Sequence, residues 1–249
     1  MKPFIIFCLI FLSMMGTSCK KSSSPTEPEK AKAPVALAEY GSSIDEYYYK
    51  IWSDSTWECF NRTLTINGTF YATIMDCYGN EYYYSSEGYA GFQIYGDSLI
   101  LFDQPMPSLP DTINFNQKYV QTATFTYDGY KYRLQDEQTL HDTSTVSVSF
   151  GTYSCLWFEA KSIITSGDQS QAAATQAWMA KGPSNIKEIL NSGDTIFMTE
   201  GVVNGKGYGN ASPKIRADKN NYQNDQIMKN SGKSLLNLVS TGIHFKFKI

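Results

Sequence analysis

Residues 59–77 read CFNRTLTINGTFYATIMDC, and this stretch decides the fold class. Asn67-Gly68 lies at its centre between two runs of apolar and β-branched residues, a pattern typical of a β-hairpin. Pairing Leu64 with Ala72 gathers the apolar side chains on one face, whereas the pairing of Leu64 with Tyr71 that a two-residue turn requires scatters them over both faces. The set is Phe60, Leu64, Ile66, Phe70, Ala72 and Ile74. Because a one-residue slip moves every side chain of a strand to the other face, we expect a three-residue or bulged turn.

The same register sets Cys59 opposite Cys77, on the other face of the hairpin. Of the five cysteines, Cys8 lies in an N-terminal apolar run and Cys19 directly follows that segment, which leaves Cys59, Cys77 and Cys155. An exported chain meets an oxidising compartment, where thiols pair. We therefore predict a disulfide between Cys59 and Cys77, with a buried pair of thiols as the alternative. Cys155 is expected to be a small core side chain, and whether it is free is left open.

Segments of strand character flank the hairpin on both sides. They are short, aromatic or β-branched, and divided by Gly, Asn and Asp, which indicates an antiparallel all-β domain. The expected strands are 47–52, 58–66, 69–76, 81–85, 88–95, 98–102, 118–127, 130–135, 146–150, 154–160, 186–190 and 195–199. The proline-rich stretch 104–110 interrupts the series, since proline cannot donate to a ladder. Residues 171–181, QAAATQAWMAK, fit a helix by alanine content or a strand.

The first residues predict export. Residues 1–18 combine a basic start with an apolar run that is shorter than the roughly 20 residues of a membrane-spanning helix, so they are typical of a signal peptide. Gly16-Thr17-Ser18-Cys19 resembles the lipobox of bacterial lipoproteins, although the usual Leu three residues before the Cys is missing. That resemblance implies a diacylated Cys19 as the first mature residue. An ordinary signal peptide with a nearby free thiol is the alternative.

The rest of the chain divides by composition. Residues 19–38 are expected to be the lipidated Cys and a flexible linker, 39–200 an antiparallel β domain, 201–233 a polar loop or partly disordered segment, and 234–249 a C-terminal edge strand guarded by lysines. Two acyl chains give stable membrane attachment. Lys20 stands where Asp is associated with inner-membrane retention, so by resemblance the domain is expected on the outer membrane facing the periplasm, with surface display left open.

The composition points away from several functions. With 21 Lys+Arg against 24 Asp+Glu, the formal net charge is −3, which argues against nucleic-acid binding. Neither His141 nor His244 has metal-ligand spacing, and we expect His141 in a solvated loop and His244 on the surface. The acidic pairs 45–46 and 136–137 are likewise expected in solvated loops. We therefore predict no catalytic residues, no metal site and no cofactor.

A resemblance narrows the fold further. Residues 147–159, SVSFGTYSCLWFE, followed by 176–188, QAWMAKGPSNIKE, resemble a recurring pair of segments in uncharacterised bacterial envelope lipoproteins. The resemblance implies a strongly curved antiparallel sheet, half-barrel-like or β-sandwich-like, with no established activity. It also favours a strand over a helix for 171–181.

Aromatic residues are the one positive indication of function. The triplets 47–49 and 82–84 are all Tyr, and a triplet in a strand places at least one ring on each face. The first hypothesis is a non-catalytic, lipid-anchored envelope protein that binds a lipid-like ligand or an envelope partner. The alternative is a carbohydrate-binding accessory lipoprotein whose exposed Tyr rings, with Trp52 or Trp57, stack on sugars. A hydrolase comes third. Core filling by residues of high β-propensity is the preferred explanation of the rings, and the oligomeric state is left open.

Overall fold

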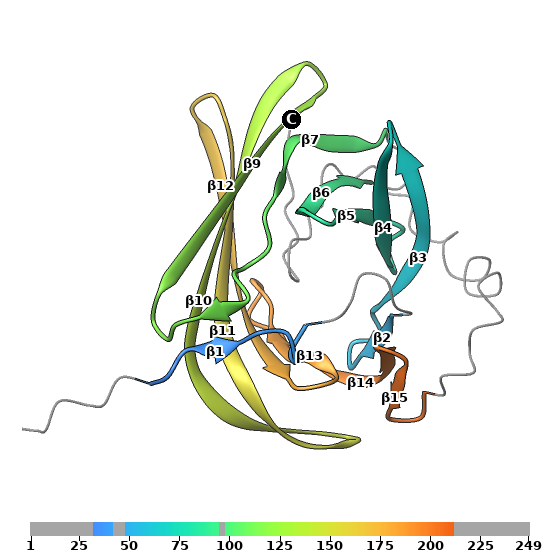
Figure 1. Cartoon of the computed structure of the whole chain (residues 1–249), viewed down its shortest axis with the longest axis vertical. Helices are drawn as coiled ribbons and strands as arrows, with labels where there is room; N and C mark the ends of the chain where they lie inside the picture. Colours follow the sequence, from blue (N-terminus) through green and yellow to red (C-terminus); the bar gives the residue numbers. More distant parts are fainter. Residues whose placement is uncertain (1–31, 42–47, 95–97, 212–249) are drawn as a thin grey trace, which may run out of the picture. The chain divides into compact units, whose positions relative to one another are not determined.

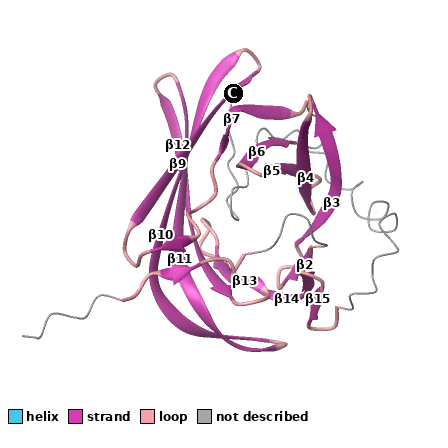
Figure 2. Cartoon of the chain, viewed as in Figure 1, coloured by secondary structure: helices cyan, strands magenta, loops and turns pink. Residues whose placement is uncertain are grey.

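The computed structural model describes residues 32–41, 48–94 and 98–211, all of which belong to the larger of two compact units, Lys32–Ile249. Every regular element within these ranges is a β-strand (Figure 2). The all-β prediction is therefore confirmed. The predictions for Cys19, the acidic pair 45–46 and the 234–249 strand lie outside the described residues. In the described part of the chain, no helix has the length and apolar character needed to cross a membrane.

The strand bounds extend several of the predicted segments. They are β1 (Val35–Ala36), β2 (Tyr49–Trp52), β3 (Trp57–Ile66), β4 (Thr69–Asp76), β5 (Glu81–Ser85), β6 (Gly88–Gln93), β7 (Ile100–Met106), β8 (Thr112–Ile113), β9 (Lys118–Tyr127), β10 (Tyr130–Val148), β11 (Gly151–Ser166), β12 (Gln169–Ala180), β13 (Ser184–Ile189), β14 (Thr195–Val203) and β15 (Lys206–Tyr208). Residues 171–180 are a strand, as the resemblance implied. β7 runs through Pro105, so the predicted break at 104–110 begins later than expected.

One large antiparallel sheet contains most of these strands. Its order is β7-β6-β5-β4-β3-β2-β14-β13-β12-β11-β10-β9, with β15 paired to β14, while β1 and β8 form a separate two-stranded ladder. Nearly all neighbours in the sheet are also neighbours in sequence. The exception is β2 beside β14, which joins the first and last parts of the described chain.

The two ends of this order come together in space. β7 and β9 are the terminal strands, yet Phe102 of β7 lies with its ring centroid 5.6 Å from that of Phe125 in β9, and Thr124 donates a hydrogen bond to Asp103. The sheet therefore curls until its edges meet, with β2–β7 facing β9–β12 (Figure 1). This confirms the strongly curved antiparallel sheet. We call the concave side of the sheet, which carries Phe102 and Phe125, the inner face.

The central hairpin has a different register from the predicted one. Ile66 pairs with Thr69 and Leu64 with Tyr71, across a two-residue turn in which Asn67 and Gly68 have φ of 49° and 83°. The prediction of a three-residue turn is wrong. A β-bulge between Phe60 and Arg62 shifts the pairing farther down the strand, so the apolar residues before and after the bulge face opposite sides of the sheet.

The register also overturns the basis of the disulfide prediction. Cys59 lies opposite Met75, not opposite Cys77, and the structure holds both half-buried sulfurs as thiols. The two-residue turn displaces the pairing of Cys59 by one residue and the bulge displaces it by another. Cys155 is a buried thiol in a hydrophobic cluster, which confirms its place in the core.

Two expected loops lie inside β10. His141 sits at a β-bulge between Leu140 and Asp142, and its ring packs 5.0 Å from that of Trp157 in β11. Asp136, expected in a solvated loop, is only 2% exposed. Both loop predictions are wrong because β10 continues as a single strand through this polar stretch, paired along its length with β11.

Candidate functional site

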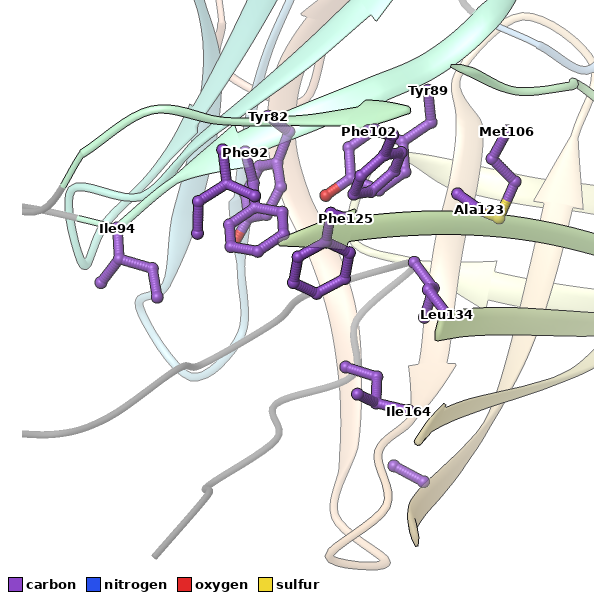
Figure 3. Close-up of a cluster of buried hydrophobic side chains, with 12 residues drawn as sticks. Tyr82, Tyr89, Phe92, Ile94, Phe102, Met106, Ala123, Phe125, Leu134 and Ile164 are labelled. Atoms are coloured by element: carbon purple, nitrogen blue, oxygen red, sulfur yellow. The ribbon is translucent and has the colours of Figure 1, made fainter. Parts of the chain in front are cut away.

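Aromatic rings fill the inner face where the two edges of the sheet meet. Phe92 of β6 and Phe125 of β9 (Figure 3) pack edge to face with centroids 5.5 Å apart. Phe125 also stacks on Tyr132 of β10, with centroids 5.3 Å apart. The cluster takes side chains from β5, β6 and β7 on one side and from β9 to β12 on the other. The cluster therefore forms only when strands that are far apart in the sheet order come together.

A charged cluster lies on the same face, at β2, β3 and β13. Lys50 of β2 is 1% exposed and stands directly opposite Glu58 of β3. Its ammonium donates a hydrogen bond of 2.8 Å to the main-chain carbonyl of Asn185, and Asn185 donates through its side-chain amide to Glu188. We call Lys50, Glu58, Asn185 and Glu188 the Lys50 cluster.

Aromatic rings surround the ammonium of Lys50. Its Nζ lies 5.2 Å from the ring centroid of Tyr48 and 5.7 Å from that of Trp52, distances at which a cation is attracted to an aromatic face. The Tyr48 hydroxyl in turn donates to Glu58. Tyr48, Lys50 and Trp52 alternate along one strand, so all three point to the same side.

Burial shifts the titration of this cluster. It lowers the pKa of Lys50, although Glu58 and Glu188 act in the opposite direction. Burial also raises the pKa of Glu188 to about 8, and the charge of Glu58 adds to that increase while Lys50 opposes it. At neutral pH the raised pKa favours the protonated form of the Glu188 carboxyl.

A second buried carboxyl lies across the inner face, on β10. Asp136 accepts hydrogen bonds from the Ser162 hydroxyl at 2.7 Å and from the Gln138 amide at 2.6 Å. Burial raises the pKa of Asp136, and the two hydrogen bonds oppose the shift. We call these three residues the Asp136 group.

Two tyrosines on the inner face, Tyr84 and Tyr89, are each affected by a carboxyl of one of these groups. Their ring centroids are 5.4 Å apart on paired positions of β5 and β6. Burial raises the pKa of both hydroxyls; the charge of Glu58 adds to the effect at Tyr84, and that of Asp136 adds to it at Tyr89. Among the described residues, the Tyr89 hydroxyl has no hydrogen-bond partner. The inner face thus combines packed aromatic rings with a few buried polar groups.

The tyrosines predicted to be exposed platforms are buried instead. Tyr48, Tyr49, Tyr82 and Tyr83 all lie in the core, as does Trp52. Trp57 is half-buried. The expectation of exposed sugar-stacking rings is therefore wrong for the buried residues. The curled sheet encloses Tyr82, and a second cluster buries Tyr83 together with Tyr71.

A separate aromatic row crosses β10 to β13 on the other face of the sheet. Trp157 and Trp178 stack at 6.1 Å with an interplanar angle of 9°, and the Lys187 ammonium lies 3.9 Å from the Trp178 ring centroid. His141 extends the row, and its Nε2 lies 3.4 Å from a Glu159 carboxylate oxygen without the geometry of a hydrogen bond. Lys187 covers Trp178, so this row is occupied by the protein's own cation.

Sequence reasoning missed Lys50, Asp136 and Glu188. The signal for Lys50 was its place between two aromatic residues at alternate positions, which marks a charged side chain on an apolar face. Asp136 and Glu188 carried no local signal, since their burial depends on partner strands. No cluster of three or more His, Cys, Asp or Glu suited to a metal occurs within 32–41, 48–94 and 98–211.

The chain is similar only in structure to the known proteins that follow, at sequence identities of 8–9%. No protein-family model and no curated protein matches the chain. Solved structures that are similar include a "putative lipoprotein" from Parabacteroides distasonis, with 8% identity and a TM-score of 0.29 over 61% of this chain and 92% of that one. A "putative exported protein with YmcC-like fold" from Bacteroides fragilis has 9% identity and a TM-score of 0.33 over 61% and 92%. The hypothetical lipoprotein YmcC from Escherichia coli has 8% identity and a TM-score of 0.33 over 61% and 84%. Similarity at this level carries no argument about function.

Proposed function

We propose that this protein is a non-catalytic, lipid-anchored component of a bacterial cell envelope, and that its curved sheet binds a lipid-like ligand on the inner face. The N-terminal lipobox-like sequence ending at Cys19 supports the anchor. The domain then faces the periplasm from the outer membrane.

One observation carries the binding proposal. The Tyr89 hydroxyl is buried among aromatic rings without a partner in the described part of the chain. A buried polar group left unpaired costs about 1–3 kcal/mol, so its presence on an aromatic face favours a ligand that pairs with it. The rings around it are apolar, which favours a lipid-like ligand over a wholly polar one.

Metabolic labelling with radioactive palmitate in the host tests the anchor. We expect label in the wild-type chain, no label after Cys19→Ala, and unchanged labelling in the control variants Cys77→Ser and Cys155→Ser. Label that persists in Cys19→Ala contradicts the anchor.

Native mass spectrometry of the Cys19→Ala chain purified from the host tests ligand binding. Without an attached acyl group, any lipid mass that co-purifies is a non-covalent ligand. We expect such a mass in the Cys19→Ala chain. It should be lost when Cys19→Ala is combined with Phe92→Trp, which enlarges a side chain in the aromatic seam, the cluster of Phe92, Phe102 and Phe125 between the two edges of the sheet. Absence of any bound lipid contradicts the binding proposal.

A further inference from the structure

The hairpin of β10 and β11 runs past both of its neighbouring strands. β9 pairs with β10 only over residues 130–139, and β12 pairs with β11 only over residues 155–166. Beyond these limits the two strands continue as a ribbon that turns between Val148 and Gly151 (Figure 1, lower end). We call residues 143–148 of β10 the open edge, because no strand of the described residues pairs with them on the side away from β11.

Contacts on one face hold this ribbon in place. Val146 is 6% exposed and belongs to the same hydrophobic cluster as Tyr208 of β15. The ring of Phe150, in the turn of the ribbon, lies 5.8 Å from that of Tyr208. The Ser149 hydroxyl donates a 3.1 Å hydrogen bond to the main-chain carbonyl of Thr199 in β14. The open edge is therefore fixed to the body of the sheet through its packed face.

The open edge lacks the features that usually prevent a strand from pairing with another chain. Edge strands are commonly protected by charged side chains, by proline or by a bulge. Residues 143–148 read TSTVSV, without a charged residue or proline, and Thr and Val favour strands. The bulge of β10 lies earlier, between Leu140 and Asp142. Because alternate residues direct their main-chain N–H and C=O groups away from β11, the open edge is a template for one further strand.

The sequence of the open edge complements itself in the antiparallel direction. A two-fold axis at Val146 places this side chain beside its own copy, which sets apolar against apolar at the centre. On the exposed face it places Thr145 directly opposite Ser147 of the second chain, hydroxyl against hydroxyl. On the packed face, Ser144 then lies opposite Val148. With no charged residue in the segment, this pairing brings no like charges together.

A second copy fits this edge better than a peptide of another protein. An added strand gains its affinity from main-chain hydrogen bonds and its specificity from pockets for alternate side chains. The exposed side chains along the open edge are Thr and Ser, which are too small to form the walls of such pockets. In an isologous pair, by contrast, the same surface supplies both partners and the contact closes at two copies.

We propose that residues 144–148 of β10 pair antiparallel with the same residues of a second copy, about a two-fold axis at Val146. The dimer then contains one continuous ribbon in the order β11-β10-β10-β11. This assembly goes beyond the proposed function, since it depends neither on the ligand nor on the lipid anchor. Because the paired segment is short, the dimer is in reversible equilibrium with the monomer.

Sedimentation velocity over a concentration series tests the proposal on the purified Cys19→Ala chain, with a reductant present so that thiols cannot cross-link. We expect a monomer–dimer equilibrium. Thr145→Lys combined with Ser147→Lys puts lysines directly opposite each other across the two-fold axis, so the Kd should rise about tenfold. Thr145→Lys alone should raise the Kd about threefold, and it keeps the test valid if the double variant unfolds.

Thr152→Lys combined with Ser154→Lys is the matched control. These exposed residues of β11 pair directly with Ser147 and Thr145 in the same ribbon, so the control adds the same charges to the same face, one strand away from the open edge. At about 10 Å from the second copy these charges are largely screened, and the Kd should stay within about twofold of wild type. Circular dichroism establishes that each variant is folded.

Three outcomes overturn the proposal while leaving the proposed function standing. The first is a chain that stays monomeric throughout the concentration series. The second is a dimer whose Kd is the same in the folded lysine variants of the open edge as in wild type. The third is an assembly larger than a dimer, because an isologous contact closes at two copies.

Discussion

The ammonium of Lys50 donates a 2.8 Å hydrogen bond to the main-chain carbonyl of Asn185, although β14 separates β2 from β13 in the sheet. The side chain therefore reaches past a neighbouring strand and fastens the first strand of the sheet in sequence to one near its end. Glu58 lies opposite Lys50, and Glu188 lies nearby. Lys50 thus stabilises the junction between β2 and the β13–β14 pair, whose residues are more than 130 positions apart in the sequence.

Replacing Lys50 tests this junction. Lys50→Met should lower the free energy of unfolding by about 1–3 kcal/mol, because it removes the donor to the Asn185 carbonyl and the cation opposite half-buried Glu58. Urea unfolding monitored by circular dichroism measures the loss. Lys131→Met is the control: its ammonium is largely exposed and 4.0 Å from Asp103, so it should cost less than about 1 kcal/mol. Equal losses in the two variants would contradict a structural role for buried Lys50.

The pH dependence of stability should report Glu188. Its pKa is raised from the ordinary 4.5 to about 8, so the folded chain keeps a proton that the unfolded chain has already lost over this range. Stability from this group is full below pH 4.5 and is lost as the pH rises toward 8. The slope is on the order of 1 kcal/mol per pH unit.

Urea unfolding at a series of pH values measures that slope, and Glu188→Gln should flatten it because the amide does not titrate. The variant Glu159→Gln, which changes an exposed carboxylate, should keep the wild-type slope. An unchanged slope in Glu188→Gln would assign the pH dependence to other groups, Asp136 among them.

The aromatic seam predicts the cost of opening the curled sheet. Phe125 is fully buried and contacts rings from β6, β7 and β10, so Phe125→Ala should lower the free energy of unfolding by about 3–5 kcal/mol. Tyr130, the first residue of β10, is 64% exposed. The control variant Tyr130→Ala should therefore stay within about 0.5 kcal/mol of wild type. Thermal unfolding followed by circular dichroism compares them. A small effect of Phe125→Ala would mean that the edges of the sheet do not depend on this contact.

Cys155 should be the slowest thiol of the domain to react. Burial raises its pKa to about 11, so little thiolate forms at pH near 8, and the side chain is only 1% exposed. Alkylation with iodoacetamide followed by peptide mass mapping should modify half-buried Cys77 first and Cys155 only after denaturant is added. A cross-linked peptide that joins Cys59 to Cys77 in the unreduced chain would restore the disulfide prediction.

Much of the architecture was predictable from local patterns. The positions of the hairpin turns at Asn67-Gly68 and Asp128-Gly129 follow from residue types that tolerate positive φ, although the turn at Asn67-Gly68 has two residues and not the three expected. Alternation of apolar residues located the strands around them, and the GTY and WMAKG motifs correctly favoured a strand over a helix for 171–180.

Register was harder to predict because it depends on single inserted residues. No residue type marks the bulge between Phe60 and Arg62 in the sequence, yet it moves Cys59 one residue farther from Cys77 than the two-residue turn does. The bulge at His141 likewise lets a polar stretch continue as strand instead of leaving the sheet as a loop.

The sequence by itself determined that this chain is built from antiparallel strands and where its tight turns lie, since both depend on neighbouring residues, while export and lipidation at Cys19 stay predictions. Only the tertiary structure decided which side chains are buried. Lys50, Asp136 and Glu188 look like ordinary surface residues in the sequence, and they are enclosed because the sheet curls until β7 meets β9. Enclosure depends on strands distant in the chain, and for that reason no local pattern announces it.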